Sequence, residues 1–186
     1  MIAIPLGLTI LRLALGPLAI FFALSHQPHL IYAPLLLLGM LSDIFDGVIA
    51  RRLGVAHPWL RRFDSATDIV FYSCIFVTTC LVAGDAVRRA IIPLSLLAAS
   101  EAACLAIGLV RFGSLPAIHS YSAKIYGLAI FLTFLGVLAF DFGSWAFFVL
   151  AIVALIANAE IIAILLLSRN TPVDVLSVFH LNRRSV

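Results

Sequence analysis

Successive apolar runs of about 20 residues dominate this chain and restrict it to very few folds. A helix of that length crosses the hydrocarbon core of a bilayer, where every backbone polar group needs an internal partner. Continuous apolar runs favour helices over the alternating pattern of a barrel. The sequence therefore predicts an all-α integral membrane protein with six transmembrane helices. Each span ends at charge, proline or glycine, and the six are Pro5–Leu24, Leu30–Leu53, Leu60–Ala83, Val87–Val110, Lys124–Phe140 and Ser144–Leu167.

Composition supports this class and excludes others. Of the 186 residues, 63% are hydrophobic and 11% are charged, and the mean hydropathy is +1.17. Soluble domains carry about 25% charged residues. These values exclude a soluble enzyme, a nucleic-acid binder and a disordered chain. No linker, repeat or low-complexity tract interrupts the sequence, so we expect a single domain over residues 1–186.

The basic residues predict the orientation. Only Arg88 and Arg89 lie on one side of the six-span arrangement. Because Lys and Arg are enriched in cytoplasmic loops, both termini are expected in the cytoplasm and the protein in the cytoplasmic (inner) membrane. The tail from Asn170 to Val186 is predicted to be a short interfacial helix on the cytoplasmic face or a frayed end. Ten basic residues lie on the cytoplasmic side: Arg12, Arg51, Arg52, Arg61, Arg62, Arg111, Lys124, Arg169, Arg183 and Arg184.

Four of the nine acidic residues fall within one 26-residue window of the second and third spans. An ionised carboxylate within an apolar span costs about 2.5–3.5 kcal/mol, which makes these residues functional candidates. Asp43 and Asp46 are three residues apart and Asp64 and Asp68 four apart, so each pair shares one helical face. The short turn between the spans makes them antiparallel neighbours. We therefore expect the four carboxylates to converge near the cytoplasmic ends.

Four carboxylates in one pocket repel one another unless cations compensate them. Two divalent ions would balance their charge, and hard oxygen ligands favour Mg²⁺ or Mn²⁺. Paired metal ions are a known arrangement for phosphoryl displacement. The alternative is a purely structural set of salt bridges with Arg51, Arg61 or Arg62.

Small and basic residues accompany the acids. Gly47 and Ala50 leave the face that carries Asp43 nearly free of side chains, which suits either a bulky ligand or a packed helix. Arg51 follows and is placed to meet a phosphate. Near the fifth span, Arg111 and Lys124 are either acceptor-binding residues for an anionic head group or interfacial anchors.

The segment from Asp43 to Arg51, followed by Asp64 and Asp68, resembles the signature of the CDP-alcohol phosphotransferase (CDP-alcohol phosphatidyltransferase) family, D-x2-D-G-x2-A-R-x8-G-x3-D-x3-D. Seven of its eight fixed positions match at the right spacing, and Leu60 stands where the second glycine is expected. The opening 4–12 is similar to the P-x3-T-x2-R start of phosphatidylglycerophosphate synthase relatives. The resemblance covers roughly residues 4–170.

This resemblance implies a membrane enzyme of phospholipid biosynthesis with its acidic site facing the cytoplasm. It would transfer a phosphatidyl group from a CDP-alcohol, usually CDP-diacylglycerol, to a small polar alcohol and release CMP. The implied partners are the CDP-lipid, the polar alcohol acceptor, membrane lipids and a second copy in a homodimer. No nucleic acid is expected.

The resemblance also implies a role for each matching residue. The two divalent ions would be held by Asp43, Asp46, Asp64 and Asp68. Asp68 would also serve as general base. The CDP group would be bound by Gly47, Ala50, Arg51 and, from the first span, Thr9.

Two other functions fit parts of the pattern. Leu60 at the glycine position is compatible with a non-catalytic member that binds CDP-lipid or metal without turnover. A small ion transporter would use the acids as a pathway, although all four lie toward one side of the membrane. The sequence leaves the acceptor open among glycerol 3-phosphate, inositol phosphate, serine and other small alcohols. It also leaves Glu101 and Glu160, both inside apolar spans, without a role.

Overall fold

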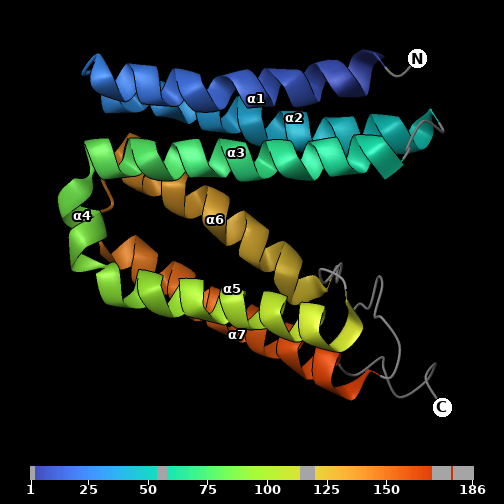
Figure 1. Ribbon diagram of the computed structural model, residues 1–186. Coiled ribbons are helices and arrows are strands. Elements are labelled where there is room, and N and C mark those ends of the chain that lie inside the picture. The colour runs from blue at the N-terminus through green and yellow to red at the C-terminus, as the bar shows by residue number, and fades with distance from the viewer. Residues whose placement is uncertain (1–2, 54–57, 114–119, 169–176, 178–186) are drawn as a thin grey trace. The chain divides into compact units, whose positions relative to one another are not determined.

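A computed structural model describes residues 3–53, 58–113, 120–168 and 177, although not the side chains of Arg51, Pro58, Arg61, Arg62 and Ser65. Within these ranges the chain is helical and contains no strand (Figure 1). The predicted all-α class is therefore confirmed. In chain order the elements are α1 (Ala3–Leu24), the 3-10 turn η1 (His29–Ile31), α2 (Tyr32–Arg52), α3 (Pro58–Val82), α4 (Gly84–Arg89), α5 (Ile91–Phe112), α6 (Tyr121–Phe140) and α7 (Trp145–Leu167).

Among the described residues, the segments long and apolar enough to cross a membrane are five: Ala3–Leu24, His29–Ala50, Ile91–Phe112, Tyr121–Phe140 and Trp145–Leu167. In α3 the apolar segment is shorter, from Ala66 to Val82, because the charges of Arg61, Arg62 and Asp64 lie in the first turns of the helix. A sixth span through α3 stays a prediction. The expected interfacial tail lies outside the described residues.

The boundary between the third and fourth spans differs from the prediction. The sequence indicated a three-residue turn at 84–86 and a span from Val87, whereas these residues form the short helix α4 and the next helix begins at Ile91. Pro93 accounts for the break. A proline inside a helix clashes with the carbonyl four residues earlier, here Arg89, but is tolerated in the first turn of a new helix.

Two compact units make up the chain, and each has its own packing. The first comprises residues 1–87 and 134–143, and within it α1 packs against both α2 and α3. Gly16 of α1 lies against Cys74, where an added Cβ would stand 3.1 Å from the Cys74 Cβ. Gly39 of α2 lies under the ring of Phe71, whose Cζ would be 2.5 Å from an added Cβ. These glycines permit the close helix packing that small residues provide in membranes.

The second unit comprises residues 88–133 and 144–186, and its main contact joins α5 to α7. The buried amide of Asn158 donates to Ser100 Oγ at 2.9 Å and to Glu101 Oε1 at 3.3 Å. Ser122 donates to Glu160. The two acids that the sequence left without a role thus take part in hydrogen bonds between helices. The single-domain prediction for residues 1–186 stays a prediction.

Candidate functional site

One buried arginine lies at the centre of the four clustered aspartates, all in the first unit. Arg12 of α1 is only 1% exposed. Its Nη1 contacts Asp43 and lies 2.7 Å from Asp68 Oδ1, and its Nη2 contacts Asp64 and lies 3.1 Å from Asp46 Oδ2. The two terminal nitrogens of a guanidinium carry two N–H bonds each. One side chain therefore donates hydrogen bonds to Asp43, Asp46 and Asp64 and forms an ion pair with Asp68.

The three helices of this unit bring these groups together. Asp43 and Asp46 lie on one face of α2, Asp64 and Asp68 lie on one face of α3, and Arg12 reaches both pairs from α1. The predicted convergence of the four carboxylates of α2 and α3 is found, and α1 contributes Arg12, which contacts all four. The packing of α1 against both other helices places Arg12 between the two pairs.

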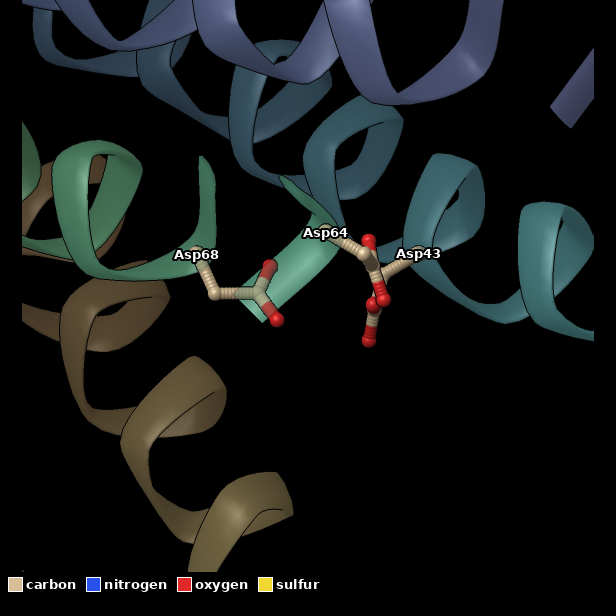
Figure 2. Close-up of side chains that lie close together, drawn as sticks. All are labelled: Asp43, Asp64 and Asp68. Carbon is tan, nitrogen blue, oxygen red and sulfur yellow. The ribbon is translucent and has the colours of Figure 1, made fainter. Parts of the chain in front are cut away.

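Three of the carboxylates form an accessible triad. Asp43 of α2 and Asp64 and Asp68 of α3 extend toward a common space (Figure 2), and one oxygen from each lies within 4.8 Å of the others. Their side chains are 49%, 31% and 36% exposed, so an ion or substrate can reach them. Asp46 is only 5% exposed. The triad is therefore the open side of the cluster and Asp46 its buried side.

The donor set of the triad fits a hard divalent cation. Mg²⁺ binds oxygen ligands at 2.0–2.1 Å, so two oxygens on one ion are separated by at most about 4.2 Å. The observed 4.8 Å needs only small side-chain adjustments to reach that limit. Arg12 offsets one of the four negative charges, and the described side chains provide no cation for the other three when all four carboxylates are ionised. Both geometry and charge favour a bound cation.

The predicted CDP-binding residues border this cluster. The Thr9 hydroxyl is buried and lies within hydrogen-bond distance of Asp46 Oδ2 at 3.2 Å and the Pro5 carbonyl oxygen at 3.1 Å. Gly47 is half-buried and Ala50 is buried on α2. The side chain of Arg51 lies outside the described atoms. Binding of CDP by these four residues stays a prediction.

The predicted acceptor residues belong to the second unit. Arg111 Nη2 donates to the carbonyl oxygen of Ser168, the C-cap of α7, at 3.2 Å. A cation near the last carbonyls of a helix is stabilising, which gives Arg111 a structural role. Lys124 is exposed, with its Nζ 5.5 Å from the centre of the Tyr121 ring. Acceptor binding by Arg111 and Lys124 stays a prediction.

From the sequence, Arg12 was expected to be a cytoplasmic charge and the arginine of the P-x3-T-x2-R start, but its contact with the acids was not predicted. A signal was present, because Arg12 is the only charged residue in the 22-residue apolar helix α1. A charged side chain at such a position needs a partner. The acids were the nearest available group of opposite sign. The alternative in which Arg51, Arg61 or Arg62 forms structural salt bridges with the acids concerns side chains outside the described atoms.

Comparison with known proteins identifies one family. A family model described as CDP-alcohol phosphatidyltransferase matches residues 2–166. The match includes Thr9, Arg12 and all four aspartates of the cluster. No curated protein and no solved structure matches the chain.

Proposed function

Because the chain belongs to the CDP-alcohol phosphatidyltransferase family, we propose that it transfers a phosphatidyl group from CDP-diacylglycerol to a small polar alcohol and releases CMP. The family implies a CDP-alcohol donor and an alcohol acceptor. The choice of CDP-diacylglycerol and the role in phospholipid biosynthesis are part of the proposal. The observation that carries it is the convergence of Asp43, Asp64 and Asp68 on one space, with oxygens within 4.8 Å.

The proposal includes two divalent ions, Mg²⁺ or Mn²⁺. Asp43, Asp46, Asp64 and Asp68 would hold them. Such ions neutralise the diphosphate and stabilise the charge that develops on departing CMP. The exposed oxygens of the triad support this assignment. Asp46 is included because it shares Arg12 with the other three carboxylates.

The chain's own residues would bind and orient the substrates. Gly47 and Ala50 present a face with little side chain, along which the diphosphate approaches the backbone of α2. Arg51 contributes positive charge for a phosphate, and Thr9 of α1 orients Asp46 through its hydroxyl. Arg111 and Lys124 are the proposed contacts for an anionic acceptor.

Asp68 is the proposed general base, because its side chain belongs to the accessible triad. It takes the proton of the acceptor hydroxyl as that oxygen bonds to the phosphorus bearing the diacylglycerol. The bond from that phosphorus to the bridging diphosphate oxygen breaks, and its electron pair leaves with CMP. The displacement needs no covalent enzyme intermediate.

The proposed setting is the cytoplasmic membrane, with the acid cluster and both termini facing the cytoplasm. Ten basic residues on one side of the span arrangement, against two on the other, support that orientation. The protein is proposed to act as a homodimer, on the basis of family resemblance. Membrane lipids surround it, and the water-soluble alcohol arrives from the cytoplasm.

The test is CMP release by the purified protein in detergent. CDP-diacylglycerol is supplied with glycerol 3-phosphate, inositol phosphate or serine, in the presence of Mg²⁺, Mn²⁺ or EDTA. We expect release with one acceptor, lost in EDTA and restored by either ion. Asp68→Asn is expected to lower the rate by about 10²–10⁴-fold, the usual contribution of a general base.

The matched control is Asp141→Asn, because this exposed aspartate lies in the same unit but outside the cluster. Its backbone has φ of 51°, which asparagine adopts readily. This variant should keep wild-type activity. Equal activity of Asp68→Asn and the wild type would contradict the proposed base.

Leu60 supports a second candidate, a non-catalytic member that binds CDP-lipid. This residue is 5% exposed and lies one helical turn before Asp64 on α3. It adds bulk where the family pattern has glycine. Metal-dependent CDP-lipid binding without CMP release, together with gain of release in Leu60→Gly, would favour this candidate over the enzyme.

A further inference from the structure

Arg12 contacts the same carboxylates that are proposed to hold metal. Its two terminal nitrogens contact all of the triad, Asp43, Asp64 and Asp68, and also the buried Asp46. Its Nε is buried and has no hydrogen-bond partner among the described atoms. Both terminal nitrogens of the side chain are thus committed to the carboxylates.

From this geometry we infer that Arg12 is an internal counter-cation that competes with divalent ions for the triad and sets the metal affinity of the site. The inference rests on the proposed function and concerns its regulation by metal. Arg12 is a positioning residue, because it acts through the aspartates that it contacts.

The competition follows from charge and from shared atoms. A guanidinium and a metal ion both draw on the negative charge of Asp43, Asp64 and Asp68, and two cations at one site repel each other. The metal-free protein depends on Arg12, because the four carboxylates would otherwise face one another without a described cation. Arg12 therefore stabilises the metal-free state and weakens metal binding.

The buried Asp46 gives Arg12 a partner that persists when ions occupy the triad. Asp46 is 5% exposed and also within hydrogen-bond distance of Thr9, at 3.2 Å. With Arg12 retained, two divalent ions and the guanidinium carry five positive charges against four negative ones. The loaded site then has one net positive charge, which attracts the anionic diphosphate of CDP. Arg12 thus opposes metal binding but favours nucleotide binding.

This opposition gives a test that a general loss of structure would not reproduce. Mn²⁺ affinity is measured by calorimetry on the purified full chain, CDP affinity is measured at saturating Mn²⁺, and thermal unfolding is followed in EDTA and in Mn²⁺. The variants are Arg12→Gln, which removes the charge, and Arg12→Lys, which keeps it. The control is Arg52→Gln, which removes an exposed charge from the same unit.

We expect Arg12→Gln to bind Mn²⁺ at least about tenfold more tightly and CDP at least about tenfold more weakly than the wild type, as removal of a neighbouring unit charge requires. Its unfolding temperature should fall in EDTA and recover in Mn²⁺. Arg12→Lys should lose less CDP affinity than Arg12→Gln, because the charge remains although an ammonium cannot reproduce the guanidinium's fork of donors. Arg52→Gln should match the wild type in all three measurements.

Weaker or unchanged Mn²⁺ binding by Arg12→Gln would overturn the inference. Failure to purify this variant in folded form, even with Mn²⁺ present, would overturn it as well. Loss of CDP binding in Arg12→Lys equal to that in Arg12→Gln would also overturn it. In each case a wild type that binds Mn²⁺ leaves the proposed function standing. Absence of Mn²⁺ binding by the wild type would instead contradict the proposed function itself.

Discussion

Hydrogen bonds from Thr9 and Arg12 of α1 hold Asp46, the buried aspartate of the cluster, in place. Thr9 shows this most clearly, because its buried hydroxyl lies between the Pro5 carbonyl oxygen and Asp46 Oδ2. Asp46 is the least exposed of the four acids, and Thr9 and Arg12 both lie within hydrogen-bond distance of its Oδ2. A buried carboxylate that loses a donor is costly. Thr9 therefore matters for the site even if it never touches the nucleotide.

Thr9→Val tests that role, because it removes the hydroxyl and keeps the shape. We expect it to lower the free energy of unfolding by about 1–3 kcal/mol, the cost of a buried polar group left with one partner fewer. Thr9→Ser keeps the donor and should lie closer to the wild type. Thermal unfolding of the purified variants measures this. A Thr9→Val protein as stable as Thr9→Ser would contradict the account.

Much of the site could be predicted at this scale. The spacing of Asp43, Asp46, Asp64 and Asp68 placed each pair on one helical face, and the structure brings all four within reach of one side chain. The separation into an open triad and a buried Asp46 could not be predicted. It depends on how α1 packs against α2 and α3, and the sequence does not encode that packing in any local pattern.

Close helix contacts position the cluster at the scale of the element. Gly39 of α2 lies under the ring of Phe71 from α3, and Gly16 of α1 lies against Cys74, which also belongs to α3. These contacts set the spacing of the three helices that carry the four aspartates and Arg12. Gly7 of α1 differs, because an added Cβ there would meet nothing within 4 Å.

Gly39→Ala should therefore be destabilising, whereas Gly7→Ala should not. The new methyl group would stand 2.5 Å from Phe71 Cζ, and overpacking of this kind costs about 1–3 kcal/mol. At Gly7 alanine has room and a better helix propensity. Thermal unfolding of both variants in detergent gives the comparison. Equal stability of the two variants would show that the Phe71 contact does not limit the packing.

Helix existence was easier to predict than helix ends. Apolar runs of about 20 residues located the five long apolar helices among the described residues, because a membrane span requires that length. The short helix α4 was missed because six residues, Gly84–Arg89, carry no periodic signal. Its end depends on Pro93, which lies inside the following helix. From the sequence alone, a proline at this position is compatible with one continuous span from Val87. In the structure the helix is interrupted at Ala90, the N-cap of α5.

At the scale of the whole molecule, the number of membrane crossings decides where the site faces. In the part of the chain that the structure describes, five segments meet the length and hydropathy expected of a span, and α3 has a shorter apolar part, Ala66–Val82. The family match extends through residues of both compact units. A crossing by α3 is needed for the six-span arrangement in which ten basic residues share the cytoplasmic side.

Reporter fusions test this crossing directly. A reporter that is active only in the cytoplasm is fused after Leu53, which follows α2, or after Asp85, which follows α3. We expect activity from the first fusion and none from the second, because α3 should carry the chain across the bilayer. Activity from both fusions would mean that α3 does not cross and that the six-span arrangement is wrong.

The transfer reaction itself is tested most directly by its products. The purified protein in lipid vesicles is given CDP-diacylglycerol, Mn²⁺ and each candidate alcohol, and both CMP and lipid products are quantified by mass spectrometry. The account predicts one new phosphatidyl-alcohol for each CMP, with both formed about 10²–10⁴-fold more slowly by Asp68→Asn. Formation of CMP with phosphatidic acid alone, whichever alcohol is present, would show hydrolysis and contradict the proposed transfer.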